Sequence, residues 1–327
     1  MSAADEVVSR PPRAGWTVVA AKELAGDLRN ARFPVLLVIL ALAAAGPVYF
    51  ASDAIKTDAS TVSGAPSLFI QMFTVAPDQV PSFAALVGFL IPLIGIGFGF
   101  DAINGERSQG TLPRLLSQPI HRDDVINGKF AAGIAIIATM LVALTALVAA
   151  LGIIRLGITP SAEEILRLLV WLLVSIVYVG LWLAFATLCS VALRRSASSA
   201  LVAIGVWIGV TLFAVFLVSA IASLLAPAGT NASAADQLAN ARWTEFLSRL
   251  SPAQLYQDAT LVLLNPSVRT ITPSLIQSAQ ADRAVASVLS LDQSLLLVWP
   301  QVVALIGLTV ACFAGAYVLF LRQEVRA

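Results

Sequence analysis

Six long apolar runs most constrain what this chain can fold into. A helix of about 20 mostly apolar residues is long enough to cross the hydrocarbon core of a bilayer. The runs are uniformly apolar rather than alternating, which favours helices over the strands of a membrane β-barrel. We therefore predict an all-α membrane protein whose transmembrane domain, 34–321, has six spans, at residues 34–51, 81–100, 126–154, 165–193, 197–225 and 295–321.

The low charge of the chain supports this class. Of its 327 residues, 58% are hydrophobic and 12% are charged, whereas a soluble domain carries about 25% charged residues. The first residues are polar and lack the apolar core of a signal peptide, so 1–33 is expected to be a cytoplasmic tail followed by a helix. Cys189 and Cys312 lie in apolar runs, where we expect them to fill space rather than form a disulfide or metal site.

The basic residues indicate the orientation of the spans. Cytoplasmic loops of membrane proteins carry an excess of Lys and Arg. If the N-terminus is inside, most of the 20 Lys and Arg residues fall in the shorter inner segments. Both termini are then cytoplasmic, including a C-terminal tail at 322–327. The loop 101–125 is cytoplasmic, the segment 226–294 is external, and the protein is a multi-pass protein of the cell membrane.

Shorter apolar patterns predict helices outside the spans. Before the first span, five apolar residues recur at helical spacing, which is typical of an amphipathic helix lying on the inner membrane surface. These residues are Val18, Ala21, Leu24, Ala25 and Leu28. A solvated helix beside the membrane is the alternative. In the first outer loop, 67–75 predicts a short interfacial helix.

The external segment predicts two more helices between spans five and six. An aromatic helix is followed by Ser251-Pro252 and by a second helix that ends at Asn265-Pro266. The second helix is too short to cross the bilayer, so it either dips into the membrane or lies on it. Its role is a simple interfacial cover or an external gate. The gate candidates are Trp243, Phe246, Pro252, Tyr256, Asn265 and Pro266.

Glycine patterns that resemble nucleotide-binding loops fail on inspection. Gly105 and Gly110 have the spacing of a phosphate-binding loop, but Thr111 and Leu112 follow where Lys and then Ser or Thr are required. The glycines at 95, 97 and 99 lie inside a span with no preceding strand, so they are no dinucleotide fingerprint.

Two pairs of glycines instead predict close helix packing. Gly95 with Gly99, and Gly205 with Gly209, are small-xxx-small pairs that let helices approach closely in lipid. The single histidine, His121, has no partner pattern for zinc or for a nucleophile. We expect no catalytic, cofactor-binding or metal-binding residue in this chain, and no nucleic-acid partner.

The centres of the predicted spans carry no ionisable residue. Proton- and sodium-coupled carriers usually need such residues within the membrane, where they are costly. Here the charged residues lie at the edges of the spans: Asp101, Glu163, Glu164, Arg167 and Asp292. An ion-coupled carrier is therefore disfavoured, and a transporter of this kind would take its energy from elsewhere.

The loop between spans two and three predicts a small apolar knob. Thr111 can cap a helix, Pro113 suits its first turn, and Pro119 ends it. Leu112, Leu115 and Leu116 then project from one face. Leucines held in this way suit docking into the groove of a partner. The alternative is a compact loop packed on the chain's own helices.

This segment resembles the signature of type-2 ATP-binding-cassette (ABC) permeases. The matching residues are Asp101, Ile103, Glu106-Arg107, Gly110-Thr111-Leu112, Leu115-Leu116-Ser117, Pro119-Ile120, Arg122 and Gly128-Lys129. The preceding "AAKELAGDLRNARF" is similar to the elbow helix of the family. Pro113 departs from the pattern, since many members carry another residue there.

The resemblance implies a transport subunit without its own nucleotide site. It implies two copies of a separate ATPase that bind ATP and Mg, and a second permease chain, either identical or related. It also implies export. The uncharged spans leave an apolar or amphipathic substrate as the physical default. A non-transporting coupler that moves an extracytoplasmic partner is the alternative function. The implied docking residues are Glu106, Arg107, Gly110, Thr111, Leu112, Leu115, Leu116, Pro119, Ile120 and Arg122.

Overall fold

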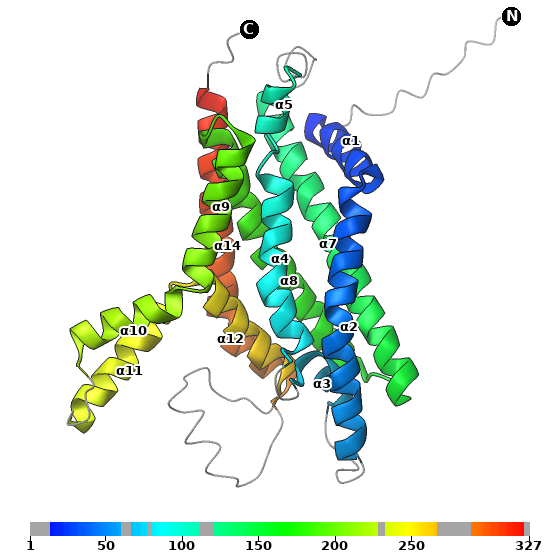
Figure 1. The fold of residues 1–327 in the computed structure, drawn as a ribbon, viewed down its shortest axis with the longest axis vertical. Coiled ribbons are helices and arrows are strands. Elements are labelled where there is room, and N and C mark those ends of the chain that lie inside the picture. Colours follow the sequence, from blue (N-terminus) through cyan, green and yellow to red (C-terminus); the bar gives the residue numbers. More distant parts are fainter. Residues whose placement is uncertain are drawn as a thin grey trace, which may run out of the picture.

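The long helices of the chain stand side by side in one bundle (Figure 1). The computed structural model describes residues 14–59, 67–76, 80–111, 121–227, 233–266 and 289–323, and every regular element in these ranges is a helix. Five helical stretches of the described residues are long and apolar enough to cross a membrane. They contain α2 (Arg32–Ala59), α4 (Phe83–Gly99), α7 (Arg122–Leu156), α8 (Ala162–Ala192) and α14 (Leu291–Arg322).

The predicted span at 197–225 is not one straight helix. It consists of α9 (Ser196–Thr211) and α10 (Ala214–Leu225), which are bent by 52° relative to each other. No proline or glycine lies at the break. Instead, the hydroxyl of Ser251 donates to the carbonyl of Val210 at 3.3 Å, next to the end of α9. The expectation of a continuous helix is therefore wrong, and the stretch forms a sixth span only if the bent pair counts as one.

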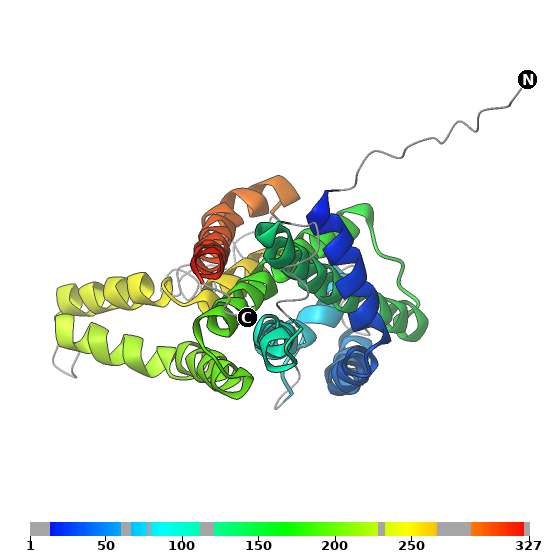
Figure 2. The same ribbon diagram turned by 90° about the horizontal axis from the view of Figure 1, so that it is seen from above.

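The helix after the bend leaves the bundle. α10 pairs with α11 (Ala234–Ser248), and the side-chain amide of Asn240 donates to the carbonyl of Ala226 at 2.7 Å. Figures 1 and 2 show the two helices side by side, projecting away from the other helices as an arm. Apolar side chains on this arm are exposed in the single chain, among them Phe216 and Phe246.

α8 forms the centre of the bundle, with α4 and α14 packed along it. Trp171 and Tyr178 on α8 are buried. α4 approaches α8 closely because it places glycine at the contact. A Cβ atom at Gly95 would lie 2.8 Å from the carbonyl oxygen of Val179, and one at Gly99 would lie 2.7 Å from the Cβ of Ala186.

Two short helices complete the core near the end of the bundle opposite α1 (Gly15–Arg29). α3 (Leu68–Thr74) is the helix predicted at 67–75, and its residues Phe69 and Phe73 are fully buried against other helices; its location at the membrane surface stays a prediction. The Phe73 ring packs edge-on against Trp171, with the centroids 6.2 Å apart. α12 (Pro252–Leu264) packs against α8 and α14, and Tyr256 and Leu263 are buried. Within the described structure one face of α12 is thus part of the core, and its role as an interfacial cover or a gate stays a prediction.

A buried arginine attaches α12 and α14 to α8. Arg167 is 1% exposed. Its guanidinium donates to the carbonyl of Leu263 at 3.2 Å, to the carbonyl of Leu289 at 2.6 Å and to the hydroxyl of Ser294 at 3.1 Å. It also forms a salt bridge at 2.9 Å with Glu163, whose side chain is half exposed. One side chain thereby joins the end of α12 and the start of α14 to α8.

Candidate functional site

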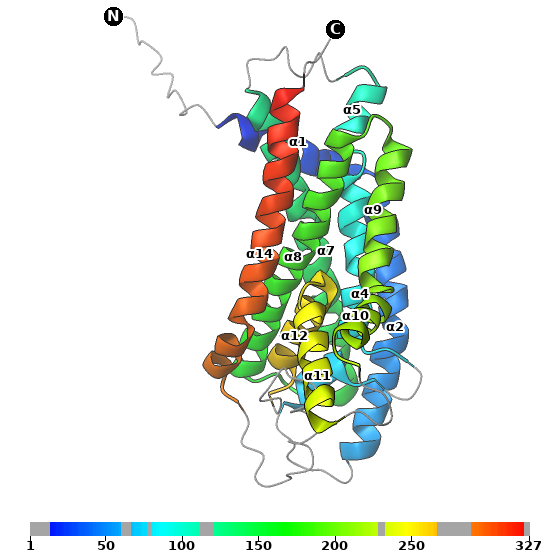
Figure 3. The same cartoon turned by 90° about the vertical axis from the view of Figure 1, so that its left-hand side faces the viewer.

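The structure describes five of the predicted docking residues: Glu106, Arg107, Gly110, Thr111 and Arg122. The segments that carry them lie at the end of the bundle where α1 crosses the long helices (Figures 1 and 3). α4 leads through a short turn into α5 (Asn104–Ser108), which begins against α8. The hydroxyl of Ser190 on α8 accepts the backbone N–H groups of Ile103 and Asn104, both at 3.1 Å. α5 is therefore fixed at its first residues, where the chain turns out of the bundle.

Lys129 on α7 connects three elements at this end. Its ammonium lies 3.2 Å from the carboxylate of Glu106 on α5 and 3.1 Å from that of Glu23 on α1. The Lys129 side chain is 9% exposed, so this double ion pair is shielded from water. Glu106 also accepts a hydrogen bond from the Thr111 hydroxyl, and its carbonyl accepts the N–H of Thr111 at 3.0 Å. This network braces the residues that lead into the loop.

Two predicted docking arginines bond within the chain itself. Arg107 donates to the side-chain carbonyl of Gln323. Arg122 donates to the backbone carbonyl of Gln323 at 3.2 Å. The amide of Gln323 in turn donates to the carbonyl of Val191 at 2.8 Å. Arg107 and Arg122 therefore tie α5 and α7 to the ends of α8 and α14, at the base of the loop.

The middle of the predicted docking loop lies outside the described residues. These positions are Leu112, Leu115, Leu116, Pro119 and Ile120. Gly110, at the entry to the loop, has a φ of 67°, a left-handed conformation that glycine adopts without steric cost. That the loop binds an ATPase stays a prediction.

α1 is fixed across the start of α7. Asp124 accepts the backbone N–H of Trp16 at 2.9 Å and that of His121 at 3.1 Å, so one carboxylate caps both helices. Gly128 allows the close contact, because a Cβ there would lie 2.6 Å from the Cβ of Val19. Burial, reinforced by the nearby Glu23 carboxylate, raises the pKa of the Asp27 carboxyl.

The predicted apolar face of α1 points away from the bundle. Val18, Ala21, Ala25 and Leu28 are exposed, whereas Leu24 is partly buried against the core. The exposed residues lie three or four positions apart and form one stripe. A membrane surface would cover this stripe, and that location stays a prediction.

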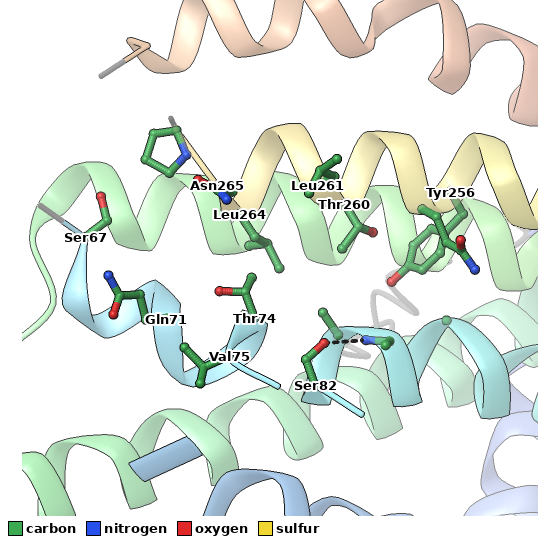
Figure 4. A pocket seen from close by; sticks show the side chains of 15 residues that line it. Ser67, Gln71, Thr74, Val75, Ser82, Tyr256, Thr260, Leu261, Leu264 and Asn265 are labelled. Carbon is green, nitrogen blue, oxygen red and sulfur yellow. Dashed lines mark hydrogen bonds between the residues drawn. The ribbon is translucent and has the colours of Figure 1, made fainter. Parts of the chain in front are cut away.

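The opposite end of the bundle contains a cavity of about 740 Å³. It lies between α12 on one side and α3 with the start of α4 on the other (Figure 4). Ser67, Gln71 and Thr74 contribute from α3 and the residue before it, and Thr260 and Asn265 from α12 and its end. Three of the predicted gate residues are among those that line the cavity.

The predicted gate residues separate into two groups. Tyr256, Asn265 and Pro266 line the cavity, and Pro252 begins the same helix. Trp243 and Phe246 instead lie on α11, in the projecting arm, where their rings meet edge to face at 6.2 Å. The structure therefore does not bring the six residues together. Their role in gating stays a prediction.

The packing glycines also separate. Gly95 and Gly99 lie against α8, as described above. A Cβ at Gly205 or Gly209 would meet no atom of the described residues within 4 Å. The described part of the chain therefore shows no close helix packing at that second pair. Among the described residues, no group of three or more His, Cys, Asp or Glu side chains could hold a metal ion.

Comparison with known proteins gives a family match over nearly the whole chain. The model of a family described as "ABC-2 family transporter protein" matches residues 17–325. The chain is 31% identical over 198 residues to the probable ABC transporter permease protein NosY of Stutzerimonas stutzeri, covering 59% of this chain and 64% of that protein. It is 37% identical over 115 residues to the NosY protein of Pseudomonas aeruginosa, covering 35% and 37%. Both alignments span less than two thirds of the relatives' own length.

Proposed function

We propose that this chain, which belongs to the ABC-2 transporter family, is a membrane-embedded permease subunit driven by a separate ATPase. The ATPase would dock on the loop at 112–120. The loop would face the cytoplasm, as would both termini. This chain would carry no nucleotide site of its own. ATP and Mg would be bound by two copies of the ATPase, and a second permease chain would complete the pathway in the lipid bilayer.

The braced base of the loop is the observation that best supports docking. α5 and the start of α7, which flank the loop, are tied to α1, α8 and α14 through Lys129, Arg107 and Arg122. A force applied to the loop would therefore reach several long helices at once.

The docking proposal is tested by changing Leu115 and Leu116 together to Asp. Burying a leucine side chain contributes about 1.5–3 kcal/mol, so loss of both should weaken ATPase capture by about a hundredfold or more. The fold of the spans should be unaffected, because the loop would lie outside the bilayer in the proposed orientation. The matched control changes Ser117 and Gln118 to Asp, which adds the same charge without removing the leucines.

Two outcomes would contradict docking. A double mutant that still captures the ATPase at full strength would exclude the leucines from the interface. A mutant whose melting temperature in detergent falls well below that of the control would show that they pack on the chain's own helices. A separate check is nucleotide binding: saturable ATP binding by the purified chain alone, at micromolar concentration, would refute the absence of a nucleotide site.

Export of an apolar or amphipathic substrate is the transport reaction we propose. The described spans carry their charged residues near their ends, which does not suit an ion-coupled pathway. The alternative is a coupler that passes motion to an extracytoplasmic partner, and the projecting arm with exposed Trp243 and Phe246 supports it. Substrate-stimulated ATPase activity of the reconstituted complex in liposomes would favour transport over coupling.

A further inference from the structure

The cavity between α3, α4 and α12 has the properties of a binding site for a small molecule. Its volume of about 740 Å³ falls within the range of about 300–1,000 Å³ that is usual for ligand pockets. All 15 residues that line it belong to the described part of the chain. It lies at the end of the bundle away from the docking loop, which is the external end in the proposed orientation.

The wall of the cavity combines uncharged polar groups with apolar surface. None of the described lining residues carries a charge. The polar lining includes Ser67, Gln71, Thr74, Gln257, Thr260 and Asn265, and apolar surface comes from α4 and from leucines of α12. An ionised ligand would lose its hydration there without meeting an opposite charge, which is unfavourable. Hydroxyl groups suit such a wall, because side-chain amides both donate and accept hydrogen bonds.

One side of the cavity is held rigidly. The Tyr256 ring stacks on Tyr178 with the centroids 4.4 Å apart, and its hydroxyl lies 2.8 Å from that of Ser175. The ring lies close against Gly88, where an added Cβ would be 3.0 Å from the ring carbon Cε1. The hydroxyl of Thr260 accepts the indole N–H of Trp171 at 3.2 Å. A wall positioned in this way keeps its shape without a ligand, which lowers the entropic cost of binding.

We propose that this cavity binds an uncharged amphiphile whose polar part carries several hydroxyl groups, and that molecules of this class are what the chain transports. The inference rests on the proposed function and adds a substrate class and a site to it. The polar part would lie along the amide and hydroxyl groups of α3 and α12. The hydrocarbon part would lie along Ala85, Leu261 and Leu264. A glycerol head and a sugar head share this chemistry.

The test uses the isolated chain in phosphatidylcholine nanodiscs and photoreactive amphiphiles that share one diazirine-bearing tail. A monoacylglycerol and an alkyl glucoside are the neutral probes; a fatty acid and an alkyltrimethylammonium are the charged ones. We expect at least one neutral probe to label peptides of α3, α12 or the start of α4, and the charged probes to label them about tenfold less. Labelling by only one neutral probe would identify the head group as glycerol or sugar.

A filled cavity provides the matched variant. Ala85 lines the cavity and is exposed, so Ala85→Trp places an indole in the space without displacing the core. Ala143→Trp makes the same change at an exposed position of α7 that is not among the lining residues. Ala85→Trp should reduce labelling about tenfold at an unchanged melting temperature, and Ala143→Trp should not. Equal labelling by charged probes, or labelling that Ala85→Trp does not reduce, would overturn the assignment.

The result is independent of the ATPase. Cavity labelling by a chain that captures no ATPase would contradict the proposed function and leave the binding site standing. Normal ATPase capture without cavity labelling would contradict the binding site and leave the proposed function standing.

Discussion

Replacing Arg167 by Met tests whether one buried guanidinium holds α12 in the bundle. Methionine replaces the aliphatic stem of the arginine, but it cannot donate to the carbonyls of Leu263 and Leu289 or to the hydroxyl of Ser294. A buried polar group left without its partner costs about 1–3 kcal/mol, and hydrogen bonds to a charged group contribute about 1.5–3 kcal/mol each. Part of this cost is offset, because the variant no longer has to bury a charged guanidinium. We expect the free energy of unfolding to fall by about 3–5 kcal/mol.

Glu163→Gln is the matched control. Glu163 is the only acidic partner of Arg167 among the described residues, but its side chain is 53% exposed. An ion pair with an exposed partner contributes about 0–1 kcal/mol. If the bonds to α12 and α14 carry the effect, Glu163→Gln should cost no more than this amount, although it removes the salt bridge.

Amide hydrogen exchange measures, residue by residue, how the Arg167→Met and Glu163→Gln variants differ in local stability. The amides in the last turn of α12, at 261–265, should exchange at least about a hundredfold faster in the Arg167→Met variant, since each 1.36 kcal/mol corresponds to a factor of ten. The amides of α2, which Arg167 does not contact, provide the internal reference. Equal exchange at 261–265 in the two variants would refute the reasoning, because the buried hydrogen bonds would then add nothing to the exposed ion pair.

Three further predictions concern packing, the docking end and the orientation. Gly95→Ala should lower the stability of the bundle, measured by thermal unfolding, by about 1–3 kcal/mol. Gly97→Ala, whose Cβ would meet no described atom within 4 Å, should instead stabilise α4 by up to about 1 kcal/mol. Equal effects of the two changes would disprove the close α4–α8 contact. Lys129→Met should loosen α1 and increase the cleavage of α1 by trypsin, whereas the charge-retaining control Lys129→Arg should not. An uncleaved α1 in the Met variant would show that the two ion pairs do not hold α1 in place. In a background without native cysteines, a membrane-impermeant thiol reagent added to intact cells should label a cysteine at Trp243 but not one at Arg122, and the opposite pattern would reverse the orientation.

The long helices were predictable because their signal is local. Five of the six apolar runs correspond to helices that are continuous over the predicted range or nearly so. Their ends differ by four residues or fewer from the prediction, except that α2 continues eight residues past position 51 to Ala59. α7 begins at Arg122 rather than at 126, because Asp124 and His121 form a capping box before the apolar run. The bend after Thr211 was not predictable, because it has no proline or glycine and depends on contacts with α11 and α12.

Most of the contacts at the two ends of the bundle could not be predicted from the sequence. Arg167 was identified only as a charge at the edge of a span, because its partners are backbone carbonyls far away in the chain. Lys129 was part of a family resemblance, but nothing in the sequence pairs it with Glu23. The cavity could be anticipated only through Tyr256, Asn265 and Pro266, since α3 was expected at the membrane surface rather than in the core.

The glycine contact between α4 and α8 has a mechanical consequence. At Gly95 and Gly99, the backbone of α4 lies directly against α8, because neither residue has a side chain. Small sliding of packed helices is the motion called shear, and α4 opposes it with no side chain of its own at these two positions. The C-terminal end of α4 leads into α5, and its N-terminal end lines the cavity. We therefore expect α4 to slide along α8 at its glycine face, and so to transmit motion between α5 and the cavity.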